Sequence, residues 1–287
     1  MSTKERFRRL DRYRVEREWK RYEGTAQRDL FRELRERFLT RHRKSGGRSL
    51  EIGPGPGRFT LLVGGEGTHR ILLDLSLEAL RTARANLAST SSPSAPLSII
   101  RGDAGEPPFR DRSFRTVSLL GNALGFAGEA WESLLTRAVG LVEPQGTVLL
   151  EIAPGAGEWS RYLARLPPGA VARLLRAPVP LIVPRVEGEG FASKQPSKKT
   201  PTRFRRISVS DAERVLGICG ARVDEVLSVA PALGGQPERV EASRGDPKGW
   251  KHLLELEEQL GGQRARHVRG AAVLIAATVA TRAPPSR

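Results

Sequence analysis

Three glycines alternate along a short stretch of the chain, at Gly53, Gly55 and Gly57, directly after an apolar run. A turn that brings the backbone close to a bound molecule needs glycine, because a side chain there would clash with that molecule. The segment Glu51 to Gly57 therefore predicts a loop that binds a ligand through its backbone. A tight turn between a strand and a helix, without a ligand, is the alternative.

The spacing of the glycines separates two kinds of nucleotide ligand. The dinucleotide fingerprint is G-x-G-x-x-G, whereas this loop is G-x-G-x-G, with Arg58 where the last glycine of the fingerprint would stand. The spacing therefore argues against NAD.

Two acidic residues follow the next two apolar runs. Asp74 stands 21 residues beyond Gly53, where a carboxylate can accept hydrogen bonds from both ribose hydroxyls of an adenosine. Asp103 follows in Arg101-Gly102-Asp103-Ala104, where it can accept a hydrogen bond from the adenine amino group. A turn or a helix cap is the alternative for Asp103.

The fourth apolar run ends in Leu119 to Phe126, with the sequence LLGNALGF. In an open α/β sheet the carboxyl ends of the strands face the ligand crevice. We therefore expect Gly121 and Asn122 to lie beside the ligand.

The elements that must position these residues are visible as alternating patterns. Apolar runs of strand length alternate with helical patterns, which is typical of βαβ units and a mostly parallel sheet. The predicted strands cover 49–52, 71–74, 97–100, 115–120, 147–152, 222–230 and 271–278. The predicted helices cover 3–22, 27–42, 77–87, 131–142, 210–216 and 248–260, and 235–247 is expected to be a polar loop.

The same patterns predict four parts of the chain. Residues 1–47 form a basic helical segment, 48–154 an α/β core, and 208–287 the rest of that core with its last two strands. Repeated prolines in 155–207 forbid a long regular element, so this part is an insertion or lid.

The four ligand-binding elements, in this order and spacing, resemble those of the class I S-adenosylmethionine-dependent methyltransferases. The resemblance covers about 48–154 and the end of the chain. It implies a Rossmann-like α/β fold with a seven-stranded, mostly parallel sheet, an antiparallel last strand and helices on both faces. Enzymes that bind NAD generally lack that ending.

The resemblance also implies the cofactor, S-adenosyl-L-methionine, and its contacts. In the family the glycine loop lies beside the methionine part, the acid after strand two holds the ribose, and residues after strand three hold the adenine. The end of strand four faces the methyl group. The matching residues of this sequence are Glu51, Gly53, Pro54, Gly55, Gly57, Asp74, Leu75, Asp103, Ala104, Gly121 and Asn122.

Sequence motifs identify the acceptor of the methyl group less clearly than they identify the cofactor. The Asn/Asp/Ser-Pro-Pro-aromatic motif of enzymes that methylate base amines is replaced by Gly121 to Leu124, and Cys219 lies in a later helix, away from the place of a cytosine-attacking thiol. A small-molecule acceptor is favoured. An RNA or protein acceptor, and a non-catalytic module that binds the cofactor, remain alternatives.

The acceptor pocket is expected in the insertion. Its apolar walls and anion-binding groups would be Trp159, Tyr162, Phe191, Phe204, Arg203, Arg205 and Arg206. A solvated loop is the alternative for 192–203. The stretch from Trp19 to Thr25 is expected either to cover the cofactor or to pack on the core.

The net charge of +16 is concentrated in two segments. Residues 1–48 hold 17 Lys and Arg against 8 Asp and Glu, and Lys194 to Arg206 holds six basic and no acidic residues. These segments indicate either a solvated face or an anionic partner, RNA included.

The remaining composition bounds the setting of the protein. One cysteine allows no internal disulfide, and the charged beginning of the chain does not resemble a secretory signal, so a cytoplasmic location is expected. The longest apolar run, 271–280, is too short to span a membrane. We assign no catalytic residue and expect no metal, since His42, His69, His252 and His267 belong to no recognised motif. The oligomeric state stays open.

Overall fold

A computed structural model describes residues 12–20, 24–89, 96–153, 205–231, 233, 237–263, 270 and 272–281. The expected insertion therefore lies almost entirely outside the described residues, and so do Trp159, Tyr162, Phe191, Arg203 and Phe204 of the expected acceptor pocket.

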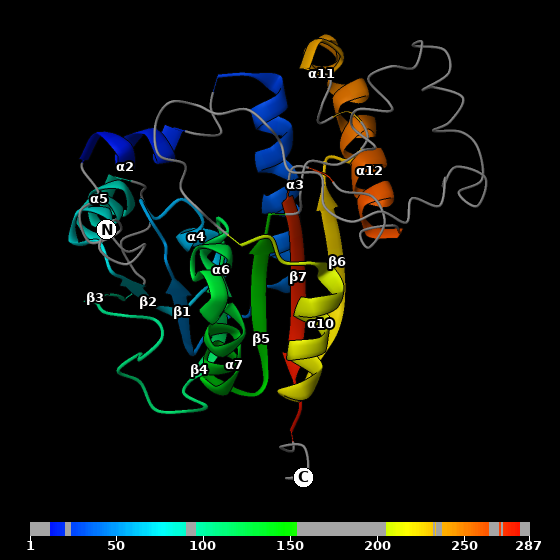
Figure 1. The fold of residues 1–287 in the computed structure, drawn as a ribbon. Coiled ribbons are helices and arrows are strands. Elements are labelled where there is room, and N and C mark those ends of the chain that lie inside the picture. Colours follow the sequence, from blue (N-terminus) through cyan, green and yellow to red (C-terminus); the bar gives the residue numbers. More distant parts are fainter. Residues whose placement is uncertain are drawn as a thin grey trace.

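A seven-stranded sheet forms the centre of the molecule, in the order β3-β2-β1-β4-β5-β7-β6 (Figure 1). The first five strands pair in parallel. β7 lies between β5 and β6 and is antiparallel to both. The strands are β1 (Arg48–Ile52), β2 (His69–Asp74), β3 (Leu97–Arg101), β4 (Phe114–Leu119), β5 (Val142–Ile152), β6 (Ala221–Val229) and β7 (Ala272–Val279). The predicted fold class, with its antiparallel ending, is confirmed.

Helices cover both faces of this sheet (Figure 1). One face carries α3 (Ala26–His42), α4 (Thr60–Val63), α5 (Leu77–Ser89) and α12 (Pro247–Gln263). The other carries α7 (Trp131–Gly140) and α10 (Val209–Ile218). Three short elements, α2 (Arg12–Trp19), α6 (Ala123–Phe126) and the 3-10 turn η2 (Gly128–Ala130), complete the described part together with α11 (Pro237–Arg244).

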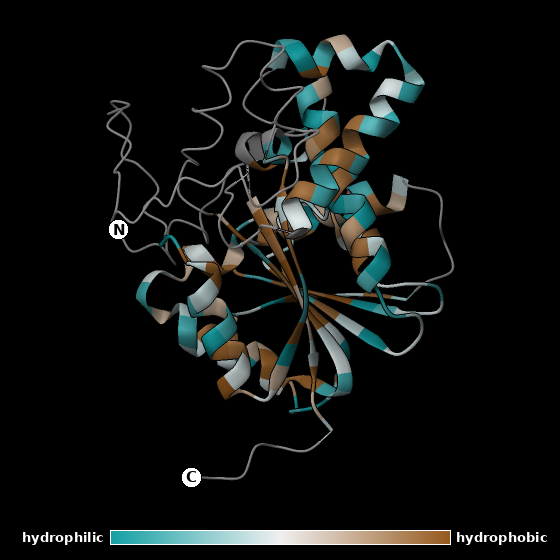
Figure 2. Cartoon of the chain, turned by 90° about the vertical axis from the view of Figure 1, so that its right-hand side faces the viewer, coloured by the Kyte–Doolittle hydropathy of each residue, from teal (hydrophilic) through white to brown (hydrophobic). Residues whose placement is uncertain are grey.

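The core lies against both faces of the central strands, which are strongly hydrophobic in Figure 2. β7 is buried over its first six residues, as expected of a strand covered on both sides. Because this strand contains most of the longest apolar run, burial in the sheet accounts for that run. In the described part of the chain no helix is long and apolar enough to cross a membrane.

The largest difference in a strand boundary is at the start of β5. β5 begins at Val142 instead of 147, because Val142 pairs with Phe114 before an irregularity in the register. Gln145, at φ 64°, and the glycine after it lie within this strand. These two residues are typical of turns, so the sequence pattern did not predict the first part of β5.

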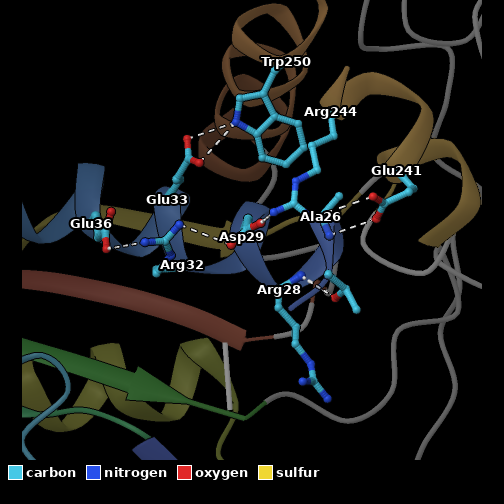
Figure 3. A network of polar contacts seen from close by, with 10 residues as sticks. Ala26, Arg28, Asp29, Arg32, Glu33, Glu36, Glu241, Arg244 and Trp250 are labelled. Carbon is cyan, nitrogen blue, oxygen red and sulfur yellow. Dashed lines mark hydrogen bonds and ion pairs between the residues drawn. The ribbon is translucent and has the colours of Figure 1, made fainter. Parts of the chain in front are cut away.

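The prediction of a polar loop over 235–247 is wrong, since α11 covers Pro237–Arg244. The sequence of α11 has almost no amphipathic pattern, and Val240 is its one buried residue. Contacts with α3 stabilise the helix, as Figure 3 shows. Oε2 of Glu241 accepts a hydrogen bond from the Ala26 N–H (3.1 Å), and Arg244 forms an ion pair with Asp29 (2.7 Å).

Helix α3 matches the predicted helix over 27–42 and is the main cover of its face. Its N-cap is Thr25, whose side chain accepts a hydrogen bond from the Arg28 N–H. Leu30, Leu34 and Phe38 are fully buried at helical spacing. On its outer side Glu33 accepts a hydrogen bond from the indole N–H of Trp250 in α12 (Figure 3).

Replacing Phe38 with alanine tests whether α3 is a structural part of the core. Because the ring is fully buried, we expect Phe38→Ala to lower the free energy of unfolding by about 3 to 5 kcal/mol. Thr40→Ala, on the exposed side of the same helix, should change it by less than about 0.5 kcal/mol. Urea unfolding followed by circular dichroism measures both, and equal effects would contradict the packing of α3 described above.

Candidate functional site

The glycine loop leaves β1 in a conformation that favours glycine. Gly53, Gly55 and Gly57 all have positive φ, at 67°, 56° and 82°. A side chain at Gly57 would meet Ala83 of α5 at 3.1 Å, whereas one at Gly55 would meet none of the described residues within 4 Å. Gly57 is therefore required by packing. Gly55 borders open space, as a loop that admits a ligand should.

Asp74, at the carboxyl end of β2, lies against this loop. Its Oδ1 accepts a hydrogen bond from the Ser76 N–H (2.8 Å), and its Oδ2 accepts one from the Gly55 N–H (3.4 Å). Burial raises the pKa of Asp74 to about 6, although these backbone hydrogen bonds act in the opposite direction. The structure thus brings together the glycine loop and the acid that the sequence analysis selected.

Glu51, the last residue but one of β1, is buried next to the loop. Its Oε2 accepts a hydrogen bond from the Thr60 hydroxyl (2.6 Å). Burial raises the pKa of Glu51 to about 7, while Thr60 and the charge of Arg58 lower it and Asp74 raises it further. Sequence reasoning missed Thr60, because a threonine nine residues beyond Glu51 carries no distinctive signal.

The residues that follow β4, up to the first residue of α6 at Ala123, form a lip in which two residues have positive φ. Gly121 and Asn122 both have positive φ, at 61° and 64°. A side chain at Gly121 would meet no atom of the described part of the chain within 4 Å, and one at Gly53 would meet Ala123 at 3.2 Å. The lip therefore touches the start of the glycine loop and, at Gly121, borders open space.

Two hydrogen bonds hold this lip to the end of β5. The Gly121 N–H donates to Oε2 of Glu151 (3.1 Å), and Oδ1 of Asn122 accepts from the Ala153 N–H (3.3 Å). Burial alone would raise the pKa of Glu151, but the charge and hydrogen bonds of Arg35 together with the Gly121 N–H hold that pKa below its ordinary value. Sequence reasoning missed both Arg35 and Glu151.

The residues after β3 form a turn. Oδ1 of Asp103 accepts from the Gly105 N–H (3.0 Å), and the Asp103 carbonyl accepts from the Glu106 N–H (3.1 Å). Ala104 packs against the core. Nε of Arg101 donates to the Leu75 carbonyl (3.3 Å) and so joins the ends of β3 and β2. In this structure Asp103 stabilises its own turn, and its contact with adenine remains a prediction.

Helix α2 lies next to α5, near the glycine loop (Figure 1). Nη1 of Arg58, the residue after the last glycine, donates to the Glu18 carbonyl of α2 (2.6 Å), and its guanidinium lies over the Phe59 ring at 4.8 Å. Trp19 is half-buried. The stretch from Trp19 to Thr25 is described only in part, so its expected position over the cofactor stays a prediction.

Of the expected acceptor pocket, the structure describes Arg205 and Arg206. The Arg205 N–H donates to the Gly125 carbonyl (2.8 Å), and its side chain forms an ion pair with Glu129. Arg205 therefore lies beside the α6 turn that follows the lip. Within the described ranges, no three His, Cys, Asp or Glu side chains are grouped as metal ligands would be.

The comparison with known proteins agrees with this geometry. Residues 50–146 match the family model described as a methyltransferase domain. That range begins in β1 and ends within β5, so it contains the glycine loop, Asp74, the turn after β3 and the lip. No curated protein matches the chain in sequence.

Solved structures share the fold at low sequence identity. Phosphoethanolamine N-methyltransferase 2 of Haemonchus contortus, in complex with S-adenosyl-L-methionine, is 16% identical, with a TM-score of 0.54; the match covers 98% of this chain but only 60% of that one. Magnesium protoporphyrin IX methyltransferase of Synechocystis, with bound S-adenosylhomocysteine, is 10% identical over 91% of this chain and 93% of that one, with a TM-score of 0.52.

A third similar structure contains a protein partner. It is the complex between the Haloferax volcanii Trm112 methyltransferase activator and a methyltransferase, with 18% identity over 87% of this chain and 89% of that chain, and a TM-score of 0.51. Residues 50–146 therefore match a methyltransferase domain, and the sheet around them has the fold that these solved methyltransferase structures share.

Proposed function

We propose that this enzyme transfers the sulfonium methyl group of S-adenosylmethionine to a nucleophilic nitrogen, oxygen or carbon atom of a small molecule. One observation carries the cofactor half of the proposal. The Asp74 carboxylate lies against the Gly55 N–H, and both Gly55 and Gly121 border open space at the carboxyl ends of the parallel strands. This edge of an open α/β sheet is where nucleotide ligands bind.

Each of the predicted contact residues has a role in this proposal. Asp74 accepts hydrogen bonds from the ribose hydroxyls, and the segment from Glu51 to Gly57 lies beside the methionine part. Leu75, Asp103 and Ala104 border the adenosine. Gly121 and Asn122 face the methyl group. The open space beside Gly55 and Gly121 supports these roles, because a larger side chain at either position would fill it.

The protein has mainly to align and enclose the reactants. When bound, the cofactor supplies a sulfonium that already activates the methyl group. In the proposal the loop and the lip hold the cofactor so that an acceptor can approach the methyl group in line, and they help to exclude water. When bound, S-adenosylmethionine would supply the methyl group and leave as S-adenosylhomocysteine, and an acceptor that carries a proton would release it to solvent. We assign no residue as a general base.

A small-molecule acceptor is supported by the lip sequence, which lacks the motif that grips a base amine. Two similar structures are named for phosphoethanolamine and magnesium protoporphyrin IX, so the fold accommodates small acceptors.

The internal ion pairs of α3 also weigh against RNA. Arg32, Arg35, Arg37 and Arg41 all pair with acidic side chains of this chain. Four of the five arginines of α3 are therefore paired with acids of the same chain.

Asp74→Asn tests the cofactor site. The amide is a weaker acceptor than the carboxylate, so we expect S-adenosylmethionine to bind about 10- to 100-fold more weakly, as the loss of hydrogen bonds to a charged group implies. Asp111→Asn, at an exposed acid paired with Arg137, is the matched control and should bind as the wild type does. Isothermal titration calorimetry measures all three, and a wild-type protein indifferent to the cofactor would refute the proposal.

The pKa values of Asp74 and Glu51 predict how this binding depends on pH. Both are raised, to about 6 and about 7, so lowering the pH through this range converts both carboxylates to the neutral form. The ionised forms bind a cation and accept hydrogen bonds better. The affinity for S-adenosylmethionine should therefore fall as the pH drops from about 8 to about 5, and Asp74→Asn should flatten the lower part of the curve. A constant affinity across this range would contradict the assignment.

The acceptor class is tested by transfer of a labelled methyl group into a fractionated cell extract. We expect the label in the small-molecule fraction, where it should resist both ribonuclease and protease. Asp74→Asn, at a cofactor concentration that saturates only the wild type, serves as the control. Label that enters RNA or protein would overturn the small-molecule assignment, and binding without any transfer would favour the non-catalytic module.

A further inference from the structure

We propose that Arg35 and Glu151 are positioning residues for methyl transfer, because together they hold the lip at the end of β4 in place. This inference rests on the proposed function, in which the lip faces the methyl group. Both residues are distant from the glycine loop in the sequence. Arg35 lies in α3, which comes before the first strand of the sheet, and Glu151 lies in β5, the fifth strand.

The first step of the argument is the geometry of the Glu151 carboxylate. Its Oε1 accepts from Nη2 of Arg35 (2.8 Å) and from Nε of Arg35 (3.3 Å), while its Oε2 accepts from the Gly121 N–H (3.1 Å). Both side chains are almost completely buried, at 3% and 6% exposed. One carboxylate therefore joins α3 to the lip directly.

The second step is the backbone that this carboxylate holds. Gly121 and Asn122 are consecutive residues with positive φ, and for asparagine such a conformation is less stable than the ordinary right-handed one. α6 begins directly after them, so the direction of the α6 turn depends on this conformation. The hydrogen bonds of Glu151 with Gly121 and of Asn122 with Ala153 offset that difference.

The third step is the route from the lip to the cofactor loop. Ala123 is the neighbour that a side chain at Gly53 would meet, at 3.2 Å. A shift of the lip would therefore change the contact between Ala123 and Gly53. In our proposal this start of the glycine loop lies beside the methionine part of the cofactor. Asp74, which holds the ribose in our proposal, contacts Gly55 and Ser76 instead.

Arg35 matters in this arrangement because it keeps Glu151 ionised. A charged carboxylate accepts a hydrogen bond from a backbone N–H more strongly than a neutral acid does. Without the guanidinium, burial would raise the pKa of Glu151 and so favour its neutral form. Nη1 of Arg35 is itself held by the Phe31 carbonyl one turn earlier (2.9 Å), so the guanidinium is aligned from its own helix.

The test compares two ligands that differ at the end near the lip. We expect Arg35→Met and Glu151→Gln each to weaken binding of S-adenosylhomocysteine by about tenfold, the loss of one charge-assisted hydrogen bond. Binding of adenosine should change by less than about twofold, since the Asp74 side is untouched. Arg35→Lys, which keeps the charge, should restore most of the affinity for S-adenosylhomocysteine. A loss of stability alone would weaken both ligands equally.

Two further variants guard against misfolding. Removal of one buried charge can unfold the protein, whereas replacing both partners is often tolerated, so the double variant Arg35→Met/Glu151→Met is measured as well. It should fold and still show the selective loss. Arg37→Met removes another ion pair of α3, with Glu258, and should leave both affinities unchanged. A folded double variant that binds S-adenosylhomocysteine as the wild type does would overturn the inference, and a wild type that binds neither ligand would instead refute the proposed function.

Discussion

The buried ion pair between Arg35 and Glu151 is the interaction on which the arrangement of the site depends. Moving two charges out of water costs several kcal/mol per ion, and mutual attraction offsets this only when the remaining polar atoms also find partners. Here the Phe31 carbonyl and the Gly121 N–H supply such partners. The ion pair requires one register of α3 on the sheet, and the apolar side chains of the helix pack in that same register.

Three buried carboxylates lie at the carboxyl ends of neighbouring or near-neighbouring strands, and their surroundings differ. Glu151 has a guanidinium beside it, which keeps its pKa below the ordinary value. For Glu51 and Asp74 burial outweighs the groups that favour the ionised form, so their pKa values are raised. A cofactor that carries a sulfonium and an ammonium group would favour the ionised forms of these two. The distribution of charge is consistent with a site that is completed by a cation.

The parts of this structure that the sequence predicts well are those with a local signal. The strand pattern, the helix at α3, the glycine spacing and Asp74 can all be recognised within short windows. The ion pair could not, because its partners are 116 residues apart and each looks like an ordinary charged residue. The one available signal was an acid in the otherwise apolar end of β5. Helix α11 was missed for a related reason, since tertiary contacts with α3 and α12 stabilise a polar segment as a helix.

The position of each basic side chain therefore says more about its role than the net charge of the segment does. The first 48 residues carry a large basic excess, and by composition alone that excess suggests an anionic partner. In the structure, one arginine of α3 is buried in the ion pair beside the site, and three others are paired with acids of α3, α12 and β6. Arg58 is used in the same way, because it joins the glycine loop to α2. Arginine suits this work, since its guanidinium stays charged when buried and can donate to several acceptors at once. These ion pairs give part of the basic charge of the N-terminal segment a structural role within the protein.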